Sequence, residues 1–484
     1  MVDNKSKLKN FSRTRIICTI GPSSYDIQTL KQLIEAGMSV ARINLSHGDS
    51  TEHKLIINNI RNASKELNRP IPILADLPGP KYRVGELETD QFICKNNERI
   101  FFDSSDKLNK EIINIWPSGL HKDIKKGATL LIDDGAVELD VISIDKTLIE
   151  TKVKLGGKIS SNKAVVARGF PSMLGYFTDE TTEALDFVLS NDIDFVGLSY
   201  IRNIDDIKKV KRKIESKNKS IKIISKIELK TAVDNLKSII NESDAVMVAR
   251  GDLGVHLPIS EIPSTQKFII KVANSMGKEV ITATQMLESM TENPQPTRAE
   301  VTDVHNAVID GSDAIMLSGE TSIGKFPVRS VEFMKEIAEI AEKNINNNYL
   351  RKLRFDHVTA SNAQNIDEFI AHGAADIAEQ LNAKLIVAFT ESGSTAARVA
   401  SYKPSKPVIA LSPDPKAHIS LSLRWGVYTI KAKNLSNIEE MFQFAEDMVS
   451  NEKLAKKGET IIVVAGLPIG FKGNTNLIRV ITIK

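Results

Sequence analysis

The feature that most constrains the fold is a series of short, continuously apolar segments separated by amphipathic stretches. Strands that are buried on both faces have uninterrupted apolar sequences, as in a parallel sheet covered by helices. The segments with this character cover residues 14–20, 39–44, 71–76, 194–199, 221–227, 244–250, 279–284 and 313–318. Together they predict a parallel sheet built from eight βα units.

Amphipathic helices are predicted between these strands. Residues 27–34 keep apolar side chains on one helical face, and Gly37 follows as a stop signal. Further along, Thr297 and Glu300 have the spacing of a capping box, and Gly311 lies past the end of the helix that they would begin.

Eight βα units in series favour a (β/α)8 barrel, in which chemistry takes place on the loops after the carboxyl ends of the strands. An open, doubly wound sheet is the alternative, but no Gly-x-Gly-x-x-Gly follows the first strand. We therefore predict an α/β protein whose (β/α)8 (TIM) barrel comprises residues 1–84 and 169–353.

The alternation is interrupted between residues 85 and 168, where we predict an inserted β-rich domain. No long amphipathic helix occurs there, and residues 99–104, 128–144 and 147–155 read as strands. The pair Asp134-Gly135 fits a hairpin turn. Because the insertion follows the third strand, we expect it to hinge over the strand ends as a lid.

A second series of helices and strands begins after residue 354. Residues 367–382 and 394–403 are predicted helices, and residues 383–390, 407–412, 459–466 and 479–483 are predicted strands. We therefore expect residues 354–484 to form a separate α/β domain of ~130 residues, a common domain size.

The composition excludes several classes of protein. A length of 484 residues is too great for one ordinary domain, and a net charge of +3 gives no reason to expect a nucleic-acid or membrane surface. The two cysteines, Cys18 and Cys94, are too few for a disulfide framework. No apolar run approaches the roughly 20 residues of a membrane span, and the basic N-terminus lacks the apolar core of a secretory signal. We expect a cytoplasmic, multidomain protein.

Residues 221–258 contain the main candidate site, because two predicted strands end there in charged residues. Lys226 and Glu228 end the first, and Asp252 follows the second in the sequence Ala-Arg-Gly-Asp-Leu-Gly. Two carboxylates that leave other positions to water and substrate suit Mg²⁺ or Mn²⁺, although both could instead be surface acids. Gly251 provides backbone that a ligand can approach closely. Lys226 is either a salt-bridge partner or the cation that neutralises a phosphoryl group in transfer.

Polar residues also follow other predicted strands, so they should meet at the same end of the barrel. They are Arg42, Asn44, Ser46 and His47 after the second strand, Asp76, Lys81 and Arg83 after the third, Thr284 after the seventh, and Ser318 and Glu320 after the eighth. Arginine suits bidentate recognition of phosphate or carboxylate. Taken singly, His47 is an ordinary loop histidine and Thr284 a β-branched strand residue. Taken together, the residues predict a metal-assisted site for a small phosphorylated or carboxylated anion.

Ten segments carry a resemblance to a known family. They are RIICTIGPSS, ARINLSHG, DLPGPKYR, IISKIE, MVARGDLGV, TATQMLESM, PTRAEVTDV, MLSGETSIGKFP, SGSTAARVASYKPS and GLPIGFKGNTNLIRV. In these segments, and in their order, the chain resembles the pyruvate kinases over nearly its full length. The resemblance implies a (β/α)8 barrel, an inserted β-barrel lid and a C-terminal regulatory domain.

The resemblance also implies the reaction, which is phosphoryl transfer from phosphoenolpyruvate to ADP, giving ATP and, after protonation of enolpyruvate, pyruvate. In the family, the residue matching Lys226 contacts the phosphoryl group and the developing enolate, and those matching Glu228 and Asp252 bind the divalent ion. Arg42 matches the residue that grips the phosphate, and Thr284 lies where the substrate methyl group is protonated. A second divalent ion arrives with the nucleotide. The expected substrate and nucleotide contacts are Arg42, His47, Arg83, Lys163, Gly251, Asp252 and Thr284.

The third loop departs from the family pattern in a way that bears on potassium. Many relatives read Asp-Thr-Lys-Gly-Pro-Glu, where this chain has Leu77 for the threonine and Lys81 for the glutamate. In K⁺-dependent relatives the residues matching Asn44, Ser46 and Asp76 bind K⁺ together with that threonine. A lysine brings the same charge, and a like charge ~4 Å away would cost roughly 4 kcal/mol at an effective dielectric near 20. We therefore expect an enzyme that does not require K⁺.

Three further departures concern the lid and two histidines. The segment SSNKAVVARGFP, residues 160–171, replaces a Lys-Gly-Val-Asn-Leu-Pro-Gly-like run. Lys163 is still expected to meet nucleotide phosphates, whereas Arg168 is unexpected. His256 and His305 stand where glutamate and alanine are expected, and we interpret both as packing or interface residues.

A hydroxyl-rich turn opens a predicted helix of the C-terminal domain. It comprises Thr390, Ser392, Gly393, Ser394 and Thr395. Such a turn is either an ordinary helix start or a phosphate cradle. In relatives the matching loop binds the phosphate of an allosteric sugar phosphate or nucleotide, and the family is usually a homotetramer.

Two other functions remain open from the sequence. A metal-dependent aldolase or lyase acting on pyruvate-like acids would need the two carboxylates but not Lys226, Arg42 or a lid. A non-catalytic regulatory paralogue is expected to lose Lys226 or a metal carboxylate, and all three residues are present.

Overall fold

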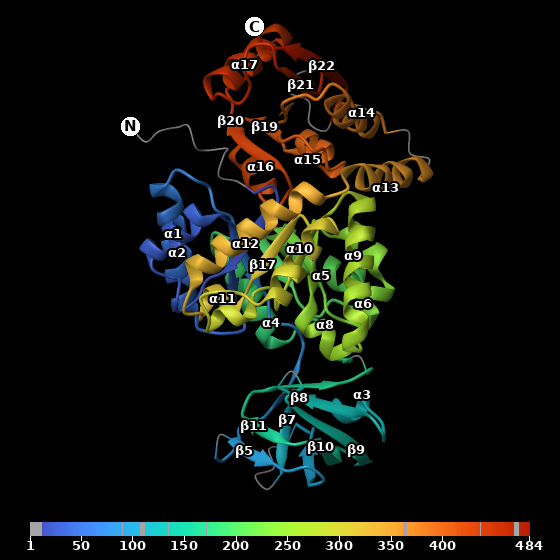
Figure 1. The fold of residues 1–484 in the computed structure, drawn as a ribbon. Coiled ribbons are helices and arrows are strands. Elements are labelled where there is room, and N and C mark those ends of the chain that lie inside the picture. The colour runs from blue at the N-terminus through green and yellow to red at the C-terminus, as the bar shows by residue number, and fades with distance from the viewer. Residues whose placement is uncertain are drawn as a thin grey trace.

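The chain folds into three parts that lie in a row (Figure 1). A barrel of strands and helices occupies the middle, a smaller β-barrel lies at one end, and an α/β domain lies at the other. The computed structural model describes residues 12–89, 91–106, 112–133, 135–170, 172–361, 365–435, 437–468 and 474–484.

The central barrel is closed by parallel strands in the order β1, β2, β3, β13, β14, β15, β16 and β17. These are β1 (Arg15–Thr19), β2 (Met38–Asn44), β3 (Ile73–Asp76), β13 (Phe195–Leu198), β14 (Lys222–Ile227), β15 (Ala245–Ala249), β16 (Glu279–Ala283) and β17 (Ala314–Leu317). β1 pairs with both β2 and β17, which closes the sheet. The predicted (β/α)8 barrel is therefore confirmed, and the alternative of an open sheet is wrong.

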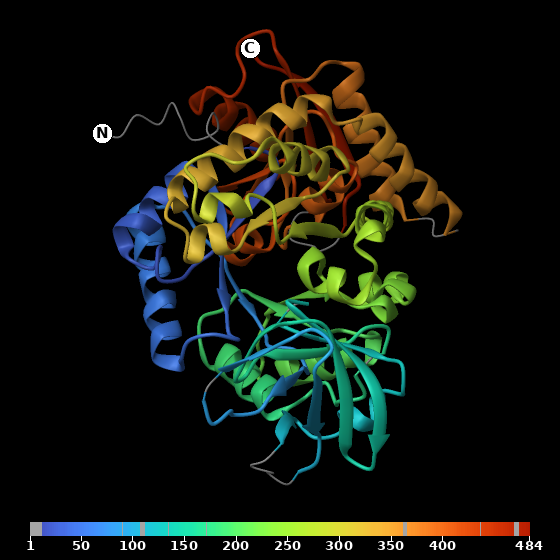
Figure 2. The same ribbon diagram turned by 60° about the horizontal axis from the view of Figure 1, so that its bottom comes forward.

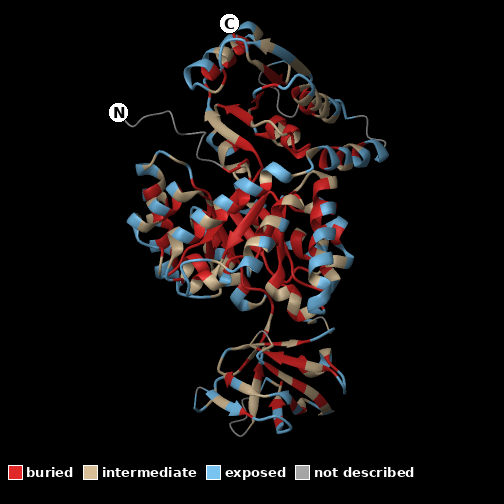
Figure 3. Cartoon of the chain, viewed as in Figure 1, coloured by how far each residue is buried: buried red, intermediate tan, exposed pale blue. Residues whose placement is uncertain are grey.

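The barrel strands are apolar throughout because both of their faces are buried (Figure 3). Ile17, Val40 and Leu74 pack inside the barrel, whereas Ile16 and Cys18 pack outward against the surrounding helices. Alternate residues of one strand thus serve two separate apolar layers, as a filled (β/α)8 barrel requires.

Helices cover the outside of the central barrel. They are α1 (Ile27–Ala36), α2 (Ser50–Glu66), α4 (Asp179–Ser190), α5 (Ile204–Ser216), α6 (Lys230–Asp234), α7 (Leu236–Glu242), α8 (Arg250–His256), α9 (Ile262–Met276), α10 (Arg298–Ile309), α11 (Gly319–Ser322) and α12 (Pro327–Ala341), with short 3₁₀ turns at Ile259–Glu261, Glu288–Thr291 and Glu342–Asn344. The capping box of Thr297 and Glu300 is confirmed, and Gly37 ends α1 with a φ of 136°. Among the described residues, no helix combines the length and apolar character needed to cross a bilayer.

Residues 250–256 differ from the prediction. The sequence suggested that the strand continues to Arg250 and is followed by a loop, but β15 ends at Ala249 and the next seven residues form α8. The polar Arg250 leaves the sheet because its side chain turns towards the next strand end, as described below.

The inserted barrel is a separate, closed β-structure (Figure 2). Its elements are β4 (Tyr82–Val84), β6 (Arg99–Asp103), β7 (Ile113–Trp116), α3 (Leu120–Asp123), β8 (Thr129–Ile132), β9 (Val137–Asp145), β10 (Leu148–Leu155) and β12 (Ala164–Ala167), beside a two-stranded sheet of β5 (Gln91–Cys94) and β11 (Gly157–Ser160). β4 precedes residue 85 but pairs with β7 and β12, so this barrel begins within the segment assigned to the central one. The predicted turn at Asp134 lies outside the described residues.

The C-terminal domain contains a five-stranded sheet in the order β20, β19, β18, β21, β22. Its elements are α14 (Ile366–Gln380), β18 (Ile386–Phe389), α15 (Ser394–Ser401), β19 (Val408–Ser412), α16 (Pro415–Ser420), β20 (Val427–Lys431), α17 (Ile438–Asn451), β21 (Thr460–Ala465) and β22 (Leu477–Thr482). The predicted boundary after residue 353 falls inside a further helix, α13 (Asn347–Ala360), which packs on α9 of the central barrel. The sequence analysis did not predict β20, α16 or α17.

Buried ion pairs join the C-terminal domain to the amino-terminal end of the barrel strands. Lys403 Nζ lies 2.7 Å from Asp313 Oδ1, just before β17, and Arg424 Nη2 lies 2.8 Å from Glu279 Oε1, at the start of β16. The inserted barrel follows β3 and therefore lies at the opposite, carboxyl end (Figure 1). A site between the two barrels would therefore lie at the carboxyl end of the strands.

Candidate active site

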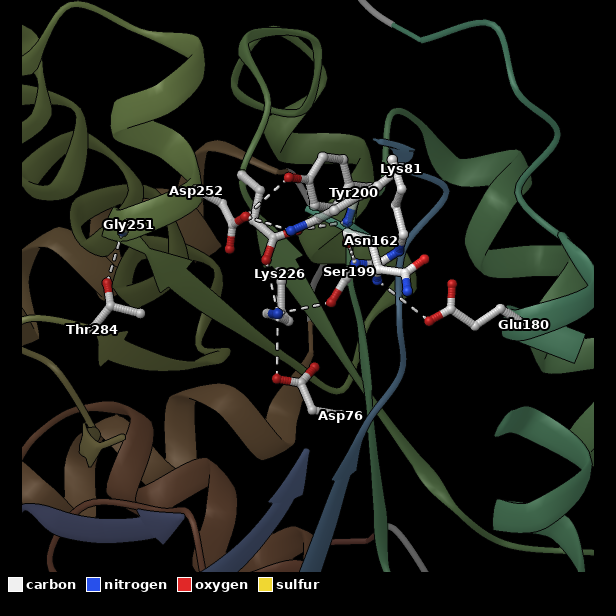
Figure 4. A network of polar contacts seen from close by, with 12 residues as sticks. Asp76, Lys81, Asn162, Glu180, Ser199, Tyr200, Lys226, Gly251, Asp252 and Thr284 are labelled. Atoms are coloured by element: carbon white, nitrogen blue, oxygen red, sulfur yellow. Dashed lines mark hydrogen bonds and ion pairs between the residues drawn. The ribbon is translucent and has the colours of Figure 1, made fainter. Parts of the chain in front are cut away.

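Arg42, Asp76 and Lys226 come from three strands and meet at the carboxyl end of the central barrel. Asp76 Oδ2 accepts hydrogen bonds from Arg42 Nε and Nη2 at 2.9 and 2.6 Å, and it lies 3.3 Å from Lys226 Nζ. Lys226 also donates to the Ser199 hydroxyl at 2.7 Å (Figure 4). One buried carboxylate therefore holds two cationic side chains in place.

Mutual attraction keeps this buried pair of acid and base charged. Burial raises the pKa of Asp76, but Lys226 and Arg42 outweigh it and hold the pKa of the carboxyl below its usual value. Burial lowers the pKa of Lys226, but Asp76, Glu228 and Asp252 outweigh it and hold the pKa of the ammonium above its usual value. Both groups are therefore ionised at neutral pH.

Glu228, directly after β14, is fully buried. Its Oε1 lies 2.8 Å from Lys226 Nζ, and its Oε2 accepts a hydrogen bond from the Tyr200 backbone N–H at 2.6 Å. Burial raises the pKa of Glu228, against the opposing pull of Lys226. Its carboxylate therefore depends on nearby positive charge.

Asp252, on α8, is the second carboxylate of the predicted metal site. Its Oδ1 accepts hydrogen bonds from Lys81 Nζ and from the Tyr200 hydroxyl, both at 2.9 Å (Figure 4). Neither of these two bonds involves Oδ2. Although burial opposes ionisation, Lys81 and Lys226 hold the pKa of Asp252 well below its usual range. Asp252 is thus ionised at neutral pH, and Tyr200 contacts both Asp252 and Glu228.

The two carboxylates suit a divalent cation whose remaining coordination positions are filled by substrate and water. Within the described residues, no group of three or more His, Cys, Asp and Glu side chains could hold a metal alone. Glu228 and Asp252 instead provide two carboxylates from consecutive strand ends, which is the typical protein share of a Mg²⁺ site. In this structure Lys226 and Lys81 contact oxygens of these two carboxylates.

Two glycines make room for this network, and the sequence analysis did not single out either. A Cβ at Gly197 of β13 would lie 2.7 Å from Asp76 Oδ1, and one at Gly79 would lie 2.6 Å from the Tyr200 ring. No side chain fits at such distances, so both positions exclude every larger residue unless the site shifts.

Thr284 follows β16 and faces the first turn of α8. Its Oγ1 accepts a hydrogen bond from the Gly251 N–H at 2.8 Å (Figure 4) and donates to the Ala283 carbonyl at 2.6 Å. The structure thus brings Thr284 beside the residue that precedes Asp252, as expected for neighbouring strand ends.

The residues of the expected monovalent-cation site are only partly brought together. Asn44 lies opposite Asp76 where β2 pairs with β3, and Asn44 Oδ1 accepts from the Ser46 N–H at 3.3 Å. Leu77 is 1% exposed and packs in the apolar layer around the barrel. Lys81 Nζ lies over the Tyr200 ring, 4.5 Å from its centroid, and pairs with Asp252, a contact that the sequence did not predict.

The expected nucleotide residues lie between the two barrels. Arg83, on β4, donates to the Asn162 carbonyl at 3.1 Å and lies 3.4 Å from Glu180 of α4 (Figure 4). Lys163 Nζ lies 2.9 Å from Asp133 of the same inserted barrel. Burial lowers the pKa of His47, and Arg83 and other nearby cations lower it further. These cations include Arg42 and Lys81, so this basic group adjoins the network around Lys226.

Several polar groups of the hydroxyl-rich turn before α15 form hydrogen bonds within the C-terminal domain. Thr390 Oγ1 accepts from the Gly393 N–H at 2.9 Å, and Thr395 Oγ1 lies 3.0 Å from Thr475 Oγ1. Gly393 has a φ of 92°, and the Ser392 hydroxyl donates to Ser394 at 3.2 Å. Ser392 is exposed and Ser394 half-buried, so these two hydroxyls face solvent.

The residues that depart from the family pattern have ordinary packing partners. His256, the last residue of α8, packs edge-on against the Tyr200 ring with centroids 5.8 Å apart. His305 is half-buried on α10. Arg168 pairs with Glu138 at 3.1 Å within the inserted barrel.

Tyr200 and Ser199 are the main site residues that the sequence analysis missed. They follow β13 directly, at the fourth strand end, where the same rule that identified the other residues applies. A tyrosine and a serine carry no charge, so they gave a weaker signal than the lysines and carboxylates nearby.

Comparison with known proteins gives the class of the molecule. The family model described as "Pyruvate kinase, barrel domain" matches residues 11–331, and "Pyruvate kinase, alpha/beta domain" matches residues 368–481. The chain is 40% identical over 471 residues to the pyruvate kinase of Thermotoga maritima, covering 97% of this chain and 99% of that one. It is 40% identical over 472 residues to that of Clostridium perfringens, with the same coverage.

A solved structure agrees. A pyruvate kinase from Cryptosporidium parvum has a TM-score of 0.91 and 36% sequence identity, and the match covers 100% of this chain and 98% of that chain. The fold and the charged strand ends, with these matches, define an enzyme that transfers phosphoryl groups. The chain belongs to the pyruvate kinase family.

Proposed function

We propose that this enzyme transfers the phosphoryl group of phosphoenolpyruvate to ADP, giving ATP and pyruvate in the last step of glycolysis, with Mg²⁺ or Mn²⁺ held by Glu228 and Asp252. The observation that carries the proposal is the network in which Asp76 fixes Arg42 and Lys226 beside Glu228. A second divalent ion is expected with the nucleotide. The bound ions would neutralise phosphate and carboxylate oxygens.

Transfer of a phosphoryl group requires little covalent chemistry from the protein, so positioning and charge dominate. Lys226, held by Asp76 and Ser199, presents an ammonium to the phosphoryl group and to the enolate oxygen that develops as it leaves. Arg42 binds the phosphate through the part of its guanidinium that Asp76 and Thr19 do not use.

Protonation of the enolate completes the reaction, and we assign Thr284 to the place where the substrate methyl group forms. Its hydroxyl lies 2.8 Å from the Gly251 N–H, whose neighbour Asp252 is a proposed metal ligand. A substrate bound to a metal ion at Asp252 would hold its methylene carbon near the hydroxyl.

Arg83, His47 and Lys163 form the proposed nucleotide site. The cations around His47 supply positive charge for the phosphates of ADP, and the pKa of the imidazole is lowered accordingly. Because Lys163 lies on the inserted barrel and His47 on the central one, closure of the inserted barrel as a lid would bring them onto one nucleotide.

Lys81 supports activity without K⁺. Its ammonium already pairs with Asp252, and the apolar Leu77 offers no side-chain oxygen at the position of the family threonine. The positive charge of Lys81 would replace that of a bound K⁺ ion.

We further propose a cytoplasmic homotetramer regulated at residues 390–395. The exposed Ser392 and the positive φ of Gly393 before α15 are suited to the phosphate of a sugar phosphate or nucleotide. Light scattering of the purified protein tests the assembly.

A lactate-dehydrogenase-coupled assay tests the function. Phosphoenolpyruvate, ADP and MgCl₂ should together give turnover, which should stop when any one is omitted or when EDTA is added. Pyruvate formation without ADP would indicate that the enzyme hydrolyses phosphoenolpyruvate instead of transferring its phosphoryl group. Absence of turnover from a folded protein, whichever divalent ion is supplied, would show that the proposal is wrong.

A further inference from the structure

The turn that presents Thr284 is strained. Thr284 has a φ of 69° and the next residue, Gln285, a φ of 51°. Both values lie in the left-handed region, which residues other than glycine rarely adopt. For a β-branched residue such as threonine this conformation is especially unfavourable. Two consecutive residues of this kind persist only where the surroundings hold them.

Arg250 holds this turn through its backbone carbonyls. Its Nη2 donates to the Thr284 carbonyl at 2.5 Å and to the Gln285 carbonyl at 3.1 Å, and its Nε lies 3.2 Å from the Thr284 carbonyl. The same Nη2 reaches Met286 Sδ at 2.8 Å. One guanidinium thus contacts three consecutive residues of the turn.

The other side of the guanidinium is anchored, so the contacts are fixed. Arg250 is 9% exposed, and its Nη1 lies 2.6 Å from Asp303 Oδ2 of α10 and 3.3 Å from Gln266 Oε1 of α9. Planar donors that point in several fixed directions are a property of arginine that lysine lacks.

Arg250 also lies next in sequence to Gly251, whose N–H donates to the Thr284 hydroxyl. The guanidinium therefore fixes the carbonyls of the turn while the following residue fixes its hydroxyl. Both halves of this clamp come from the first turn of α8, which also carries Asp252.

We propose that Arg250 is a positioning residue for the reaction, because it holds the left-handed turn that aims the Thr284 hydroxyl at the substrate. It does not touch the substrate and acts through Thr284. The inference rests on the role proposed above for Thr284.

A double-mutant cycle tests whether Arg250 acts through Thr284. Misplacing a reacting group costs about 10²-fold in rate, so Arg250→Gln should lower kcat by about that factor with little change in KM for phosphoenolpyruvate. In a Thr284→Ala background the same substitution should lower kcat by less than about threefold, because the group that it positions is gone. Equal fold losses in both backgrounds would overturn the proposal.

Two further measurements separate positioning from general damage. The affinity for Mn²⁺ in the absence of substrate, followed by electron paramagnetic resonance, should be unchanged in Arg250→Gln, and added guanidinium should restore part of the activity of Arg250→Ala. Arg351→Gln is the matched control, because Arg351 is equally buried and pairs with Asp376 and Glu379 on α14, away from the site. Guanidinium should not alter its activity, and rescue of both variants alike would contradict a specific role.

If Arg250→Gln does not fold, Asp303→Asn can be used in its place, because it removes only the carboxylate that pairs with the Arg250 guanidinium. Its kcat should fall in the natural background and not in Thr284→Ala. A failure of the role proposed for Thr284 would be seen differently, as an unchanged kcat in Thr284→Ala itself, and a failure of the proposed function as absence of turnover in the natural protein.

Discussion

Two buried lysines lie at opposite ends of the central barrel, and their pKa values move in opposite directions. Burial lowers both pKa values, but three carboxylates raise the pKa of Lys226 above its usual value. Lys403, at the joint with the C-terminal domain, faces chiefly Asp313, and burial keeps the pKa of Lys403 lowered. The facing carboxylates outweigh burial at Lys226 and do not outweigh it at Lys403.

The difference separates a binding site from a structural joint. Around Lys226, three carboxylates face the ammonium, and two of them, Glu228 and Asp252, are the proposed metal ligands. Around Lys403, one carboxylate and one carbonyl, that of Gly311, satisfy the ammonium. We infer that Lys226 takes part in the reaction, whereas Lys403 holds the C-terminal domain to the central barrel.

Replacing Lys226 should have the largest effect on activity. Removing the charge that neutralises a transferring phosphoryl group costs about 10³-fold or more, so Lys226→Met should lower kcat by at least that factor. Mn²⁺ should still bind, because Glu228 and Asp252 remain. The coupled assay and a metal titration of the same preparation provide the measurement. A loss of less than about tenfold in kcat would contradict the assigned role.

The matched substitution at the other end should affect stability instead. Lys403→Met leaves Asp313 buried without its partner, and breaking a buried pair costs about 3–5 kcal/mol. The urea midpoint of the transition involving the C-terminal domain should fall, while kcat per folded molecule stays within about twofold. Adding Asp313→Asn should recover part of the midpoint because both charges are then gone. A kcat that falls as steeply as the midpoint would remove the distinction between the two lysines.

The part of this contrast around Lys226 could be predicted from the sequence, because it depends on strands, whereas the pairing of Lys403 with Asp313 was not predicted. Runs buried on both faces identified every strand of the central barrel, and polar residues at their ends identified Arg42, Lys226, Glu228 and Asp252. The pairing of Lys81 with Asp252 was not predictable, since these residues are 171 positions apart and meet only through the path of the third loop. β20 was missed because three of its five residues are half-buried and its pattern is therefore mixed.

His256 extends the comparison to a half-buried base. Burial, against the weaker pull of Asp252, lowers the pKa of His256 to about 4, whereas an unfolded histidine titrates near 6.5. The unfolded chain therefore binds one more proton in the window from pH 6.5 to 4, and stability falls as the pH falls through it. At about 1.4 kcal/mol per pKa unit, the natural protein should lose up to about 3 kcal/mol relative to His256→Phe between pH 7 and 4. Urea unfolding at several pH values checks this, and parallel curves for the two proteins would contradict it.

Lys81 should give the smallest effect, because its ammonium already balances the charge of Asp252 at the carboxyl end of the barrel. Its ammonium pairs with Asp252, and a second unit charge beside it would be repelled. Initial rates in tetramethylammonium buffer should therefore change by less than about twofold when KCl is added. Lys81→Glu should reverse this, since it removes the tethered charge and adds a carboxylate, and K⁺ should then raise the rate. A tenfold or greater rise in the natural enzyme would mean that Lys81 neutralises only Asp252 and that the oxygens of Asn44, Ser46 and Asp76 still need an ion of their own.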